Sequence, residues 1–180
     1  MGDKMNIMIV DDEKIVRESL FHWFTKLGHT VEKASSGFEA LKILEKNPFD
    51  LLFVDIRMPE MDGIELLEKV KTEYPETLVI IITAYGSIET AVKAMQLGAS
   101  DYLLKPFKPD YLSLVMEKVT QQIKLSSEYK YLKGRLEKMT RFEYIIGQGP
   151  AMTKIFDLIP EVAQSDSSVL LVGETGTGKE

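Results

Sequence analysis

The chain has 180 residues, of which 44% are hydrophobic and 28% charged, so it can bury the core of one domain with some length left over. A formal net charge of −6, with no basic cluster, argues against a nucleic-acid-binding surface. The absence of cysteine excludes disulfides, thiolate metal sites and thiol nucleophiles. The polar start and the short apolar run after it are typical neither of a signal peptide nor of a membrane span, so we expect a cytoplasmic location.

Short apolar runs alternate with helical patterns through the first two thirds of the chain. Each run is typical of a strand buried in a parallel sheet, and the runs cover 7–10, 30–34 (weaker), 51–55, 79–83 and 102–104. Helical spacing follows each of them, with Asp62 and Ser87 as expected caps and Pro109 as the first residue of the last helix. Right-handed crossovers then place helices on both faces of the sheet. The pattern predicts an α/β, flavodoxin-like, doubly wound domain with a five-stranded parallel sheet.

Polar side chains stand where four of these strands end. Asp11 and Asp12 follow the first run, Asp55 ends the third, Thr83 ends the fourth, and Lys105 follows the fifth. Taken singly, the aspartate could be a helix cap, the threonine an ordinary strand-end hydroxyl and the lysine a solvated side chain. Because ligands of such sheets bind outside the carboxyl ends of the strands, their joint position favours a site. The Lys105–Pro106 bond is a candidate cis peptide that would aim the lysine inward.

The last helical pattern continues beyond the point where such a domain ends. Tyr111, Val115, Val119 and Ile123 are expected to pack on the sheet. Apolar residues then recur at four- and three-residue steps, at Leu125, Tyr129, Leu132, Leu136 and Met139. About two heptads are short for a coiled coil, and Gly134 weakens the helix by roughly 1 kcal/mol. We favour a helical linker over 123–142 that pairs with its copy in a homodimer, with one helix packed on its own domain as the alternative.

The last stretch has a different character. After a break at 147–150 come an amphipathic helix over 152–163 and an expected strand over 169–172. The strand leads into a glycine-rich loop of the Gly-x-x-x-x-Gly-Lys type, whose backbone N–H groups cradle phosphates. Its residues are Gly173, Glu174, Thr175, Gly176, Thr177, Gly178, Lys179 and Glu180. Since the rest of such a nucleotide-binding domain is missing, we expect a truncated domain over 143–180 that does not bind ATP usefully.

These motifs resemble two known families. Residues 6–122 resemble the receiver domain of two-component response regulators, and we set the domain at 1–122; the motifs are Asp11-Asp12, Asp55, Met58-Pro59, Asp62-Gly63, Thr83 and Lys105-Pro106. Residues 144–180 look like the opening of the ATPase domain of NtrC-like activators of sigma-54 RNA polymerase, in which Glu180 follows the lysine of the loop. The resemblance implies a parent protein with receiver, ATPase and DNA-binding parts, so that ATP, sigma-54 RNA polymerase and DNA would be bound only by the full-length parent.

The acids of the predicted site suit a divalent cation. Asp11, Asp12 and Asp55 crowd negative charge together, which costs free energy unless a cation joins them. An all-oxygen site that keeps waters and adds phosphate is typical of Mg²⁺. We expect Asp12 and Asp55 as direct ligands and Asp11 as a direct or water-mediated one. The resemblance adds the backbone carbonyl of Arg57.

The remaining site residues suit phosphoryl transfer. A carboxylate attacks a phosphoryl group only when the charge of that group is neutralised and its geometry fixed. We expect Lys105 and Thr83 to bind phosphoryl oxygens, with Asp55 as the acceptor. The resemblance implies a sensor histidine kinase as the donor, and a switch in which Tyr102 moves with the hydroxyl of Thr83.

Three classes of function remain open at this stage. A phosphorylation-switched receiver needs the Asp/Thr/Lys set, which is present. A nucleotide-hydrolysing enzyme needs the rest of the ATPase domain, so we do not expect this chain to be an enzyme. A dimerisation module with a vestigial receiver would not need the acids. We favour the receiver, which would control the assembly of an attached sigma-54-activating ATPase and hence transcription.

Overall fold

The computed structural model describes residues 4–140, 149–163, 168–170 and 172–173. The chain forms two compact units, residues 1–127 and 128–180, and each is described by itself. None of the helices in the described ranges is long and apolar enough to cross a membrane.

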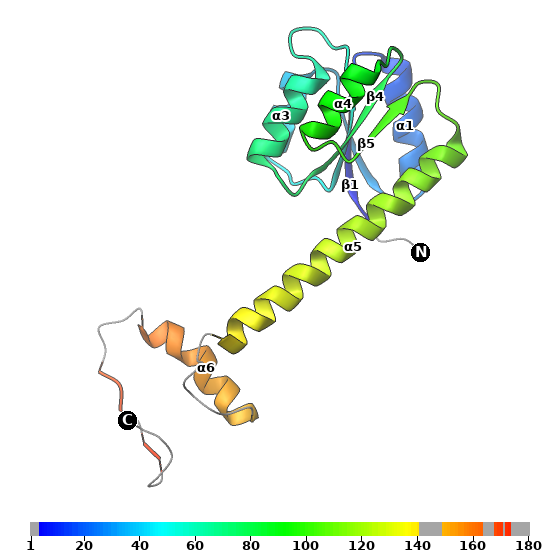
Figure 1. The fold of residues 1–180 in the computed structure, drawn as a ribbon. Coiled ribbons are helices and arrows are strands. Elements are labelled where there is room, and N and C mark those ends of the chain that lie inside the picture. The colour runs from blue at the N-terminus through cyan, green and yellow to red at the C-terminus, as the bar shows by residue number, and fades with distance from the viewer. Residues whose placement is uncertain (1–3, 141–148, 164–167, 171, 174–180) are drawn as a thin grey trace. The chain divides into compact units, whose positions relative to one another are not determined.

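The first unit is built around a parallel sheet (Figure 1). Its strands run in the order β2-β1-β3-β4-β5, and every neighbouring pair is parallel. Their bounds are β1 (Asn6–Val10), β2 (Thr30–Ala34), β3 (Leu51–Asp55), β4 (Leu78–Thr83) and β5 (Asp101–Leu104). From β1 the chain first passes to β2 on one side and then to β3 on the other side. The strand order therefore reverses at β1, as in the predicted flavodoxin-like fold. The fold prediction is confirmed.

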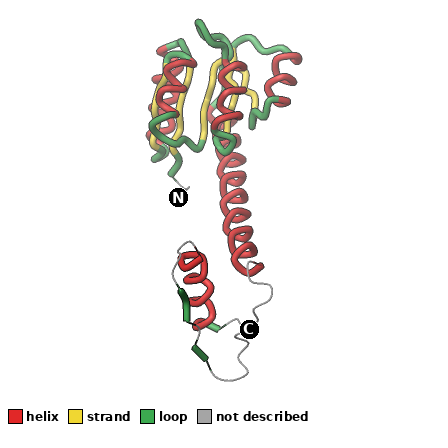
Figure 2. The backbone as a smooth tube through the Cα atoms, turned by 90° about the vertical axis from the view of Figure 1, so that its left-hand side faces the viewer, coloured by secondary structure: helices red, strands yellow, loops and turns green. Residues whose placement is uncertain are grey.

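Helices cover both faces of this sheet (Figure 2). Their bounds are α1 (Lys14–Lys26), α2 (Gly37–Leu44), α3 (Gly63–Glu73), α4 (Ile88–Gln96) and α5 (Pro109–Thr140). Helices α1 and α5 pack on one face, and α2, α3 and α4 on the other. The expected caps are confirmed: Asp62 accepts the N–H groups of Ile64 and Glu65, and Ser87 forms a capping box with Thr90.

Alternate residues of the inner strands feed two separate cores. In β3, Leu51 and Phe53 point to the α1/α5 side, while Leu52 and Val54 point to the α2/α3/α4 side. All four are fully buried. Burial of both faces explains why these strands are continuous apolar runs without alternation, which is the pattern that made them recognisable.

Helix α5 continues without a break through the predicted linker as far as Thr140. The prediction for its sheet-facing side needs one correction, because Tyr111 is 47% exposed. The buried stripe consists of Leu112, Val115, Met116 and Val119, with Ile123 partly buried against it. The helical repeat of 3.6 residues places the buried face of α5 at positions 112, 115, 116 and 119, and Tyr111 lies at the edge of this face.

The second unit contains α6 (Pro150–Ala163), which confirms the predicted helix there. The strand expected over 169–172 is not found in the residues described: 168–170 and 172–173 lie outside any strand, and Val169, Leu170 and Val172 are exposed. A strand needs neighbouring strands for its backbone hydrogen bonds, and the sheet of the described residues contains only β1 to β5. Residues 174–180 of the glycine-rich loop lie outside the described ranges.

Candidate functional site

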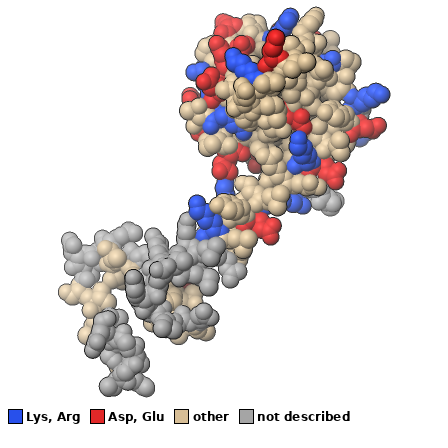
Figure 3. Space-filling view, in the orientation of Figure 1, with Lys and Arg blue, Asp and Glu red and all other residues tan. Residues whose placement is uncertain are grey.

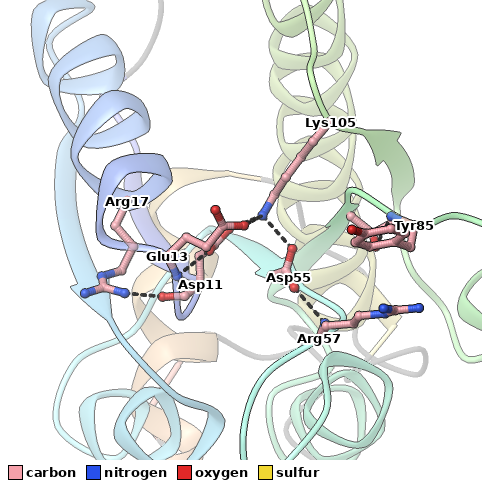
Figure 4. A network of polar contacts seen from close by, with 8 residues as sticks. Asp11, Glu13, Arg17, Asp55, Arg57, Tyr85 and Lys105 are labelled. Carbon is pink, nitrogen blue, oxygen red and sulfur yellow. Dashed lines mark hydrogen bonds and ion pairs between the residues drawn. The ribbon is translucent and has the colours of Figure 1, made fainter.

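Side chains from the carboxyl ends of three strands, β1, β3 and β5, meet at one lysine (Figure 4). The Nζ atom of Lys105, just after β5, lies 2.6 Å from Oδ2 of Asp11 and 2.6 Å from Oδ1 of Asp55. The Asp11 side chain is 0% exposed, that of Asp55 7% and that of Lys105 11%. The structure therefore brings together three of the residues that the sequence placed in one site.

Burial and charge act against each other on these groups. Burial is the main influence on Asp11 and raises the pKa of its carboxyl above 3.8, although the Lys105 ammonium and the Glu13 N–H oppose it. Burial also acts to lower the pKa of Lys105, but the hydrogen bonds to Asp11 and Asp55 outweigh it, so that this pKa lies above 10.5. At neutral pH the lysine is therefore charged.

Backbone groups fix the two carboxylates. The N–H of Glu13 donates to Oδ1 of Asp11 at 2.9 Å, and the N–H of Arg57 donates to Oδ2 of Asp55 at 2.6 Å. The guanidinium of Arg17 donates to the backbone carbonyl of Asp11. Each carboxylate oxygen thus has a donor, which lowers the cost of keeping two acids in a buried place.

Gly63 allows α3 to begin close behind β3. A Cβ atom at this position would lie 2.1 Å from the backbone carbonyl oxygen of Asp55. The N–H of Gly63 donates to the carbonyl of Ile56 at 2.9 Å. The absence of a side chain therefore sets how closely the loop after β3 folds back beneath Asp55.

Asp12 stands apart from this network. Its side chain is exposed, and among the described residues it forms no ion pair with Lys105. Glu13, which sequence reasoning missed, lies closer, with Oε1 3.7 Å from Lys105 Nζ. It follows the aspartate pair directly in the sequence, so a third adjacent acid was the signal that could have found it.

The donors present suit Mg²⁺ in kind, since Asp11, Asp12 and Asp55 offer only carboxylate oxygens at one end of the sheet. As the side chains lie, no three His, Cys, Asp or Glu residues of the described ranges gather around one point. Instead, the Lys105 ammonium supplies the positive charge between Asp11 and Asp55.

The hydroxyl residues lie on the α4 side of the site. Thr83 is buried at the end of β4, and its Oγ1 accepts the N–H of Tyr85 at 3.2 Å. Tyr102 is half-buried, and its hydroxyl lies 2.9 Å from Oγ1 of Thr90. Sequence reasoning missed Thr90, which belongs to the capping box of α4. The Lys105–Pro106 bond is cis, as the sequence suggested.

Comparison with known proteins assigns the family. Residues 7–117 match the response regulator receiver domain, and residues 145–180 match the Sigma-54 interaction domain. The chain belongs to the response regulator receiver domain family. Its five-stranded parallel sheet agrees with that assignment.

The relatives narrow the assignment further. The regulatory protein AtoC of Escherichia coli (strain K12) is 40% identical over 174 residues, which cover 97% of this chain and 38% of AtoC. The DNA-binding transcriptional regulator NtrC of Proteus hauseri is 36% identical over 177 residues, which cover 98% of this chain and 37% of NtrC. A response regulator receiver domain from Methanospirillum hungatei JF-1 has a similar structure, with a TM-score of 0.64, 36% identity, and coverage of 68% of this chain and 98% of that one.

The chain therefore contains a response regulator receiver domain, followed by a segment that matches the Sigma-54 interaction domain, and it resembles regulators such as AtoC and NtrC. It spans about two fifths of the length of the curated relatives that it matches. Its receiver is a phospho-accepting regulatory domain.

Proposed function

We propose that Asp55 accepts a phosphoryl group from a phosphohistidine of a sensor histidine kinase. The observation that supports this most is the ammonium of Lys105, 2.6 Å from Oδ1 of Asp55. Asp11 shares the same lysine but its side chain is fully buried, whereas that of Asp55 keeps 7% of its surface exposed. Of these two carboxylates, Asp55 is therefore the one that an incoming group can reach.

In the proposed transfer, a carboxylate oxygen of Asp55 forms a bond to phosphorus while the bond from phosphorus to the histidine nitrogen breaks. Lys105 binds one phosphoryl oxygen and offsets its charge, and the Thr83 hydroxyl donates to another. The Arg57 N–H holds Oδ2 of Asp55, which orients the carboxylate. Mg²⁺ held by Asp11, Asp12, Asp55 and the Arg57 carbonyl would withdraw further charge from the phosphoryl oxygens.

The proposed output is a change in the attached ATPase part. Phosphorylation would draw Thr83 toward the phosphoryl group and so shift Tyr102, whose hydroxyl contacts Thr90 in the first turn of α4. In the full-length parent, that shift would control assembly of the ATPase domains, and ATP binding there would use residues 173–180. Because the kinase consumes ATP, we place this exchange in the cytoplasm.

Intact-mass spectrometry after incubation with acetyl phosphate and Mg²⁺ tests the acceptor. The wild type and an Asp110→Asn control, which changes an exposed acid at the start of α5, should each gain one phosphoryl group. Asp55→Asn should gain none, since an amide cannot form the acyl phosphate, while its unfolding transition stays close to that of the wild type. A phosphate adduct on Asp55→Asn would rule out the assignment.

We further propose that the chain forms a homodimer through α5 together with receiver contacts. Three residues of the predicted heptad stripe are exposed: Leu125 by 67%, Tyr129 by 66% and Leu132 by 50%. The side chains of Leu136 and Met139 lie outside the part of the chain that the structure describes. A parallel pairing of two such helices would bury this stripe and bring two receivers together.

Light scattering tests the dimer on residues 1–180 and on a chain ending at Lys124. The longer chain should be a dimer at tens of micromolar and the shorter one should dissociate more readily. Leu132→Gln, on the stripe, should weaken the dimer, whereas Tyr131→Gln, which changes a large side chain that is 65% exposed but off the stripe, should not. Monomers throughout would refute the dimer.

A further inference from the structure

Hydroxyl groups of α4 and β5 form a small network beside the site. The Tyr102 hydroxyl lies 2.9 Å from Oγ1 of Thr90, in the first turn of α4. The same Oγ1 lies 3.1 Å from the backbone nitrogen of Ser87 and 3.0 Å from its carbonyl oxygen. These groups are neutral, and on the face of the receiver that Figure 3 shows, acidic and basic side chains are interspersed without a patch of one sign. The direction of the hydrogen bonds, not charge, therefore decides what this network can do.

The single proton of the Thr90 hydroxyl fixes the direction of its contact with Tyr102. A threonine hydroxyl has one proton to donate and two lone pairs that accept. The proton goes to the Ser87 carbonyl, and one lone pair accepts the Ser87 N–H. Ser87 Oγ, 3.2 Å away, is exposed and can direct its own proton to solvent. The second lone pair of Thr90 is then left for the Tyr102 hydroxyl, which is the donor of this hydrogen bond.

Gly86 leaves room for the phenol in this position. A Cβ atom at Gly86 would lie 3.1 Å from the Tyr102 hydroxyl oxygen and 2.3 Å from Cδ2 of Leu104. Gly86 belongs to the loop between β4 and α4, the loop that follows Thr83. The Tyr102 hydroxyl therefore lies close both to this loop and to the first turn of α4.

We propose that Thr90 is a positioning residue that holds Tyr102 in its resting orientation, and that this Thr90–Tyr102 latch sets how readily the receiver takes up a phosphoryl group. The inference rests on the proposed function, in which Tyr102 shifts as Thr83 is drawn toward the phosphoryl group. That shift breaks the hydrogen bond to Thr90, which costs free energy because both groups are half-buried. A receiver whose competent arrangement is less populated has a proportionally lower apparent affinity.

The residue type at position 90 favours this role over capping alone. In the common capping box, glutamate or glutamine occupies this position and accepts the N–H of the cap residue. The shorter threonine accepts the same Ser87 N–H and still has a lone pair for the phenol. The cap would also keep its other half without this hydroxyl, since Ser87 Oγ accepts the Thr90 N–H at 3.1 Å.

The test measures the affinity of the receiver for beryllofluoride, a mimic of the phosphoryl group, by calorimetric titration in the presence of Mg²⁺. Thr90→Val keeps the shape of the side chain without its hydroxyl and should bind about five-fold more tightly than the wild type, because the resting state loses one hydrogen bond. Tyr102→Phe should show a similar gain. The double variant should bind no more tightly than either single one, since both substitutions break the same contact. Thr90→Ser keeps the hydroxyl and should retain the wild-type affinity.

Ser87→Ala is the matched control for the helix cap. It removes the Ser87 hydroxyl but keeps the Ser87 N–H and carbonyl that hold Thr90 Oγ1. Unfolding followed through Trp23 should show a loss of stability, while the affinity for beryllofluoride stays at the wild-type value. Tighter binding by Ser87→Ala, or gains that multiply in the double variant, would mean that a loosened α4 causes the effect, and would overturn the latch.

The remaining outcomes separate this inference from the proposed function. A wild type that binds no beryllofluoride overturns both. A wild type that binds it, with no tighter binding in Thr90→Val or Tyr102→Phe, overturns the latch alone. Tyr102→Phe decides the question by itself where Thr90→Val does not fold, because it leaves the cap of α4 untouched.

Discussion

Replacing Lys105 by methionine should destabilise the receiver in a way that depends on pH. The substitution removes the ammonium that lies 2.6 Å from both Asp11 and Asp55, and it keeps a side chain of similar length. The two carboxylates are then left in a place where their side chains are 0% and 7% exposed. Removing one partner of a buried ion pair costs about 3–5 kcal/mol, because the other charge stays buried.

Protonation sets an upper limit to this cost. Placing a proton on a carboxyl whose ordinary pKa is 3.8 costs about 4 kcal/mol at pH 7 and about 2 kcal/mol at pH 5. Burial already raises the pKa of Asp11 in the folded state, and loss of Lys105 raises it further. A raised pKa means that the folded state binds the proton more readily, so the variant regains stability as pH falls. We expect a loss of about 3–4 kcal/mol at pH 7 and about 2 kcal/mol at pH 5.

At high pH, the stability difference between the two proteins depends on Lys105 of the wild type. Its Lys105 has a pKa above 10.5, so the contribution of this lysine is fully present below pH 10.5 and is lost as pH rises through the raised value. The difference between the wild type and Lys105→Met should therefore be largest between neutral pH and about pH 10.

Urea unfolding followed by tryptophan fluorescence measures this difference, because Trp23 is the single tryptophan and lies in the receiver. Lys118→Met is the matched control: Lys118 pairs with Asp101 at 3.2 Å, but its side chain is 64% exposed. Such a surface pair is worth at most about 1 kcal/mol, at either pH. Equal losses in the two variants at pH 7, or a loss in Lys105→Met that is the same at pH 5 and pH 7, would refute the reasoning.

Two further predictions concern the backbone around the site. Gly63→Ala should lower the free energy of urea unfolding by about 1–3 kcal/mol, because the added Cβ would lie 2.1 Å from the Asp55 carbonyl oxygen. Gly134→Ala is the control: a Cβ added there meets no other part of the described structure within 4 Å, so this variant should not be destabilised. Glu60 has a φ of 67°, with the Met61 N–H donating to the Pro59 carbonyl at 2.8 Å, so Glu60→Gly should leave stability unchanged or raise it by up to about 1 kcal/mol. Glu68→Gly, in the middle of α3, should lose about 1 kcal/mol in the same assay, and equal losses at 60 and 68 would contradict the strain argument.

The sequence predicted this fold well because its strands are buried on both faces. An apolar run that stops at a polar residue marks both the strand and its carboxyl end, so Asp11, Asp55 and Lys105 could be placed together before any geometry was known. The caps Asp62 and Ser87 could also be predicted from the sequence, since a short polar side chain just before a helical pattern commonly accepts the N–H groups of the first turn.

What the sequence did not reveal depends on side-chain direction and on distant neighbours. Thr90 contacts Tyr102 only because α4 packs beside β5, and no spacing in the chain encodes that contact. The contact between the Arg57 guanidinium and the Tyr85 ring could not be predicted either, because the two residues follow different strands. Residues 169, 170 and 172 have a composition that suits a strand, but they lie outside any strand, because a strand also needs neighbouring strands.

The choice of lysine at position 105 follows from the number of acceptors around it. An ammonium has three donors arranged in three dimensions, whereas the donors of an arginine lie in one plane. Asp11 and Asp55 take two of these donors at 2.6 Å, and Glu13, at 3.7 Å, lies beyond hydrogen-bond distance. One donor of Lys105 therefore has no acceptor among the described residues. On the proposed function, a phosphoryl oxygen on Asp55 can take this donor while Asp11 keeps its own, so the buried Asp11 carboxylate never loses its counter-ion during the transfer.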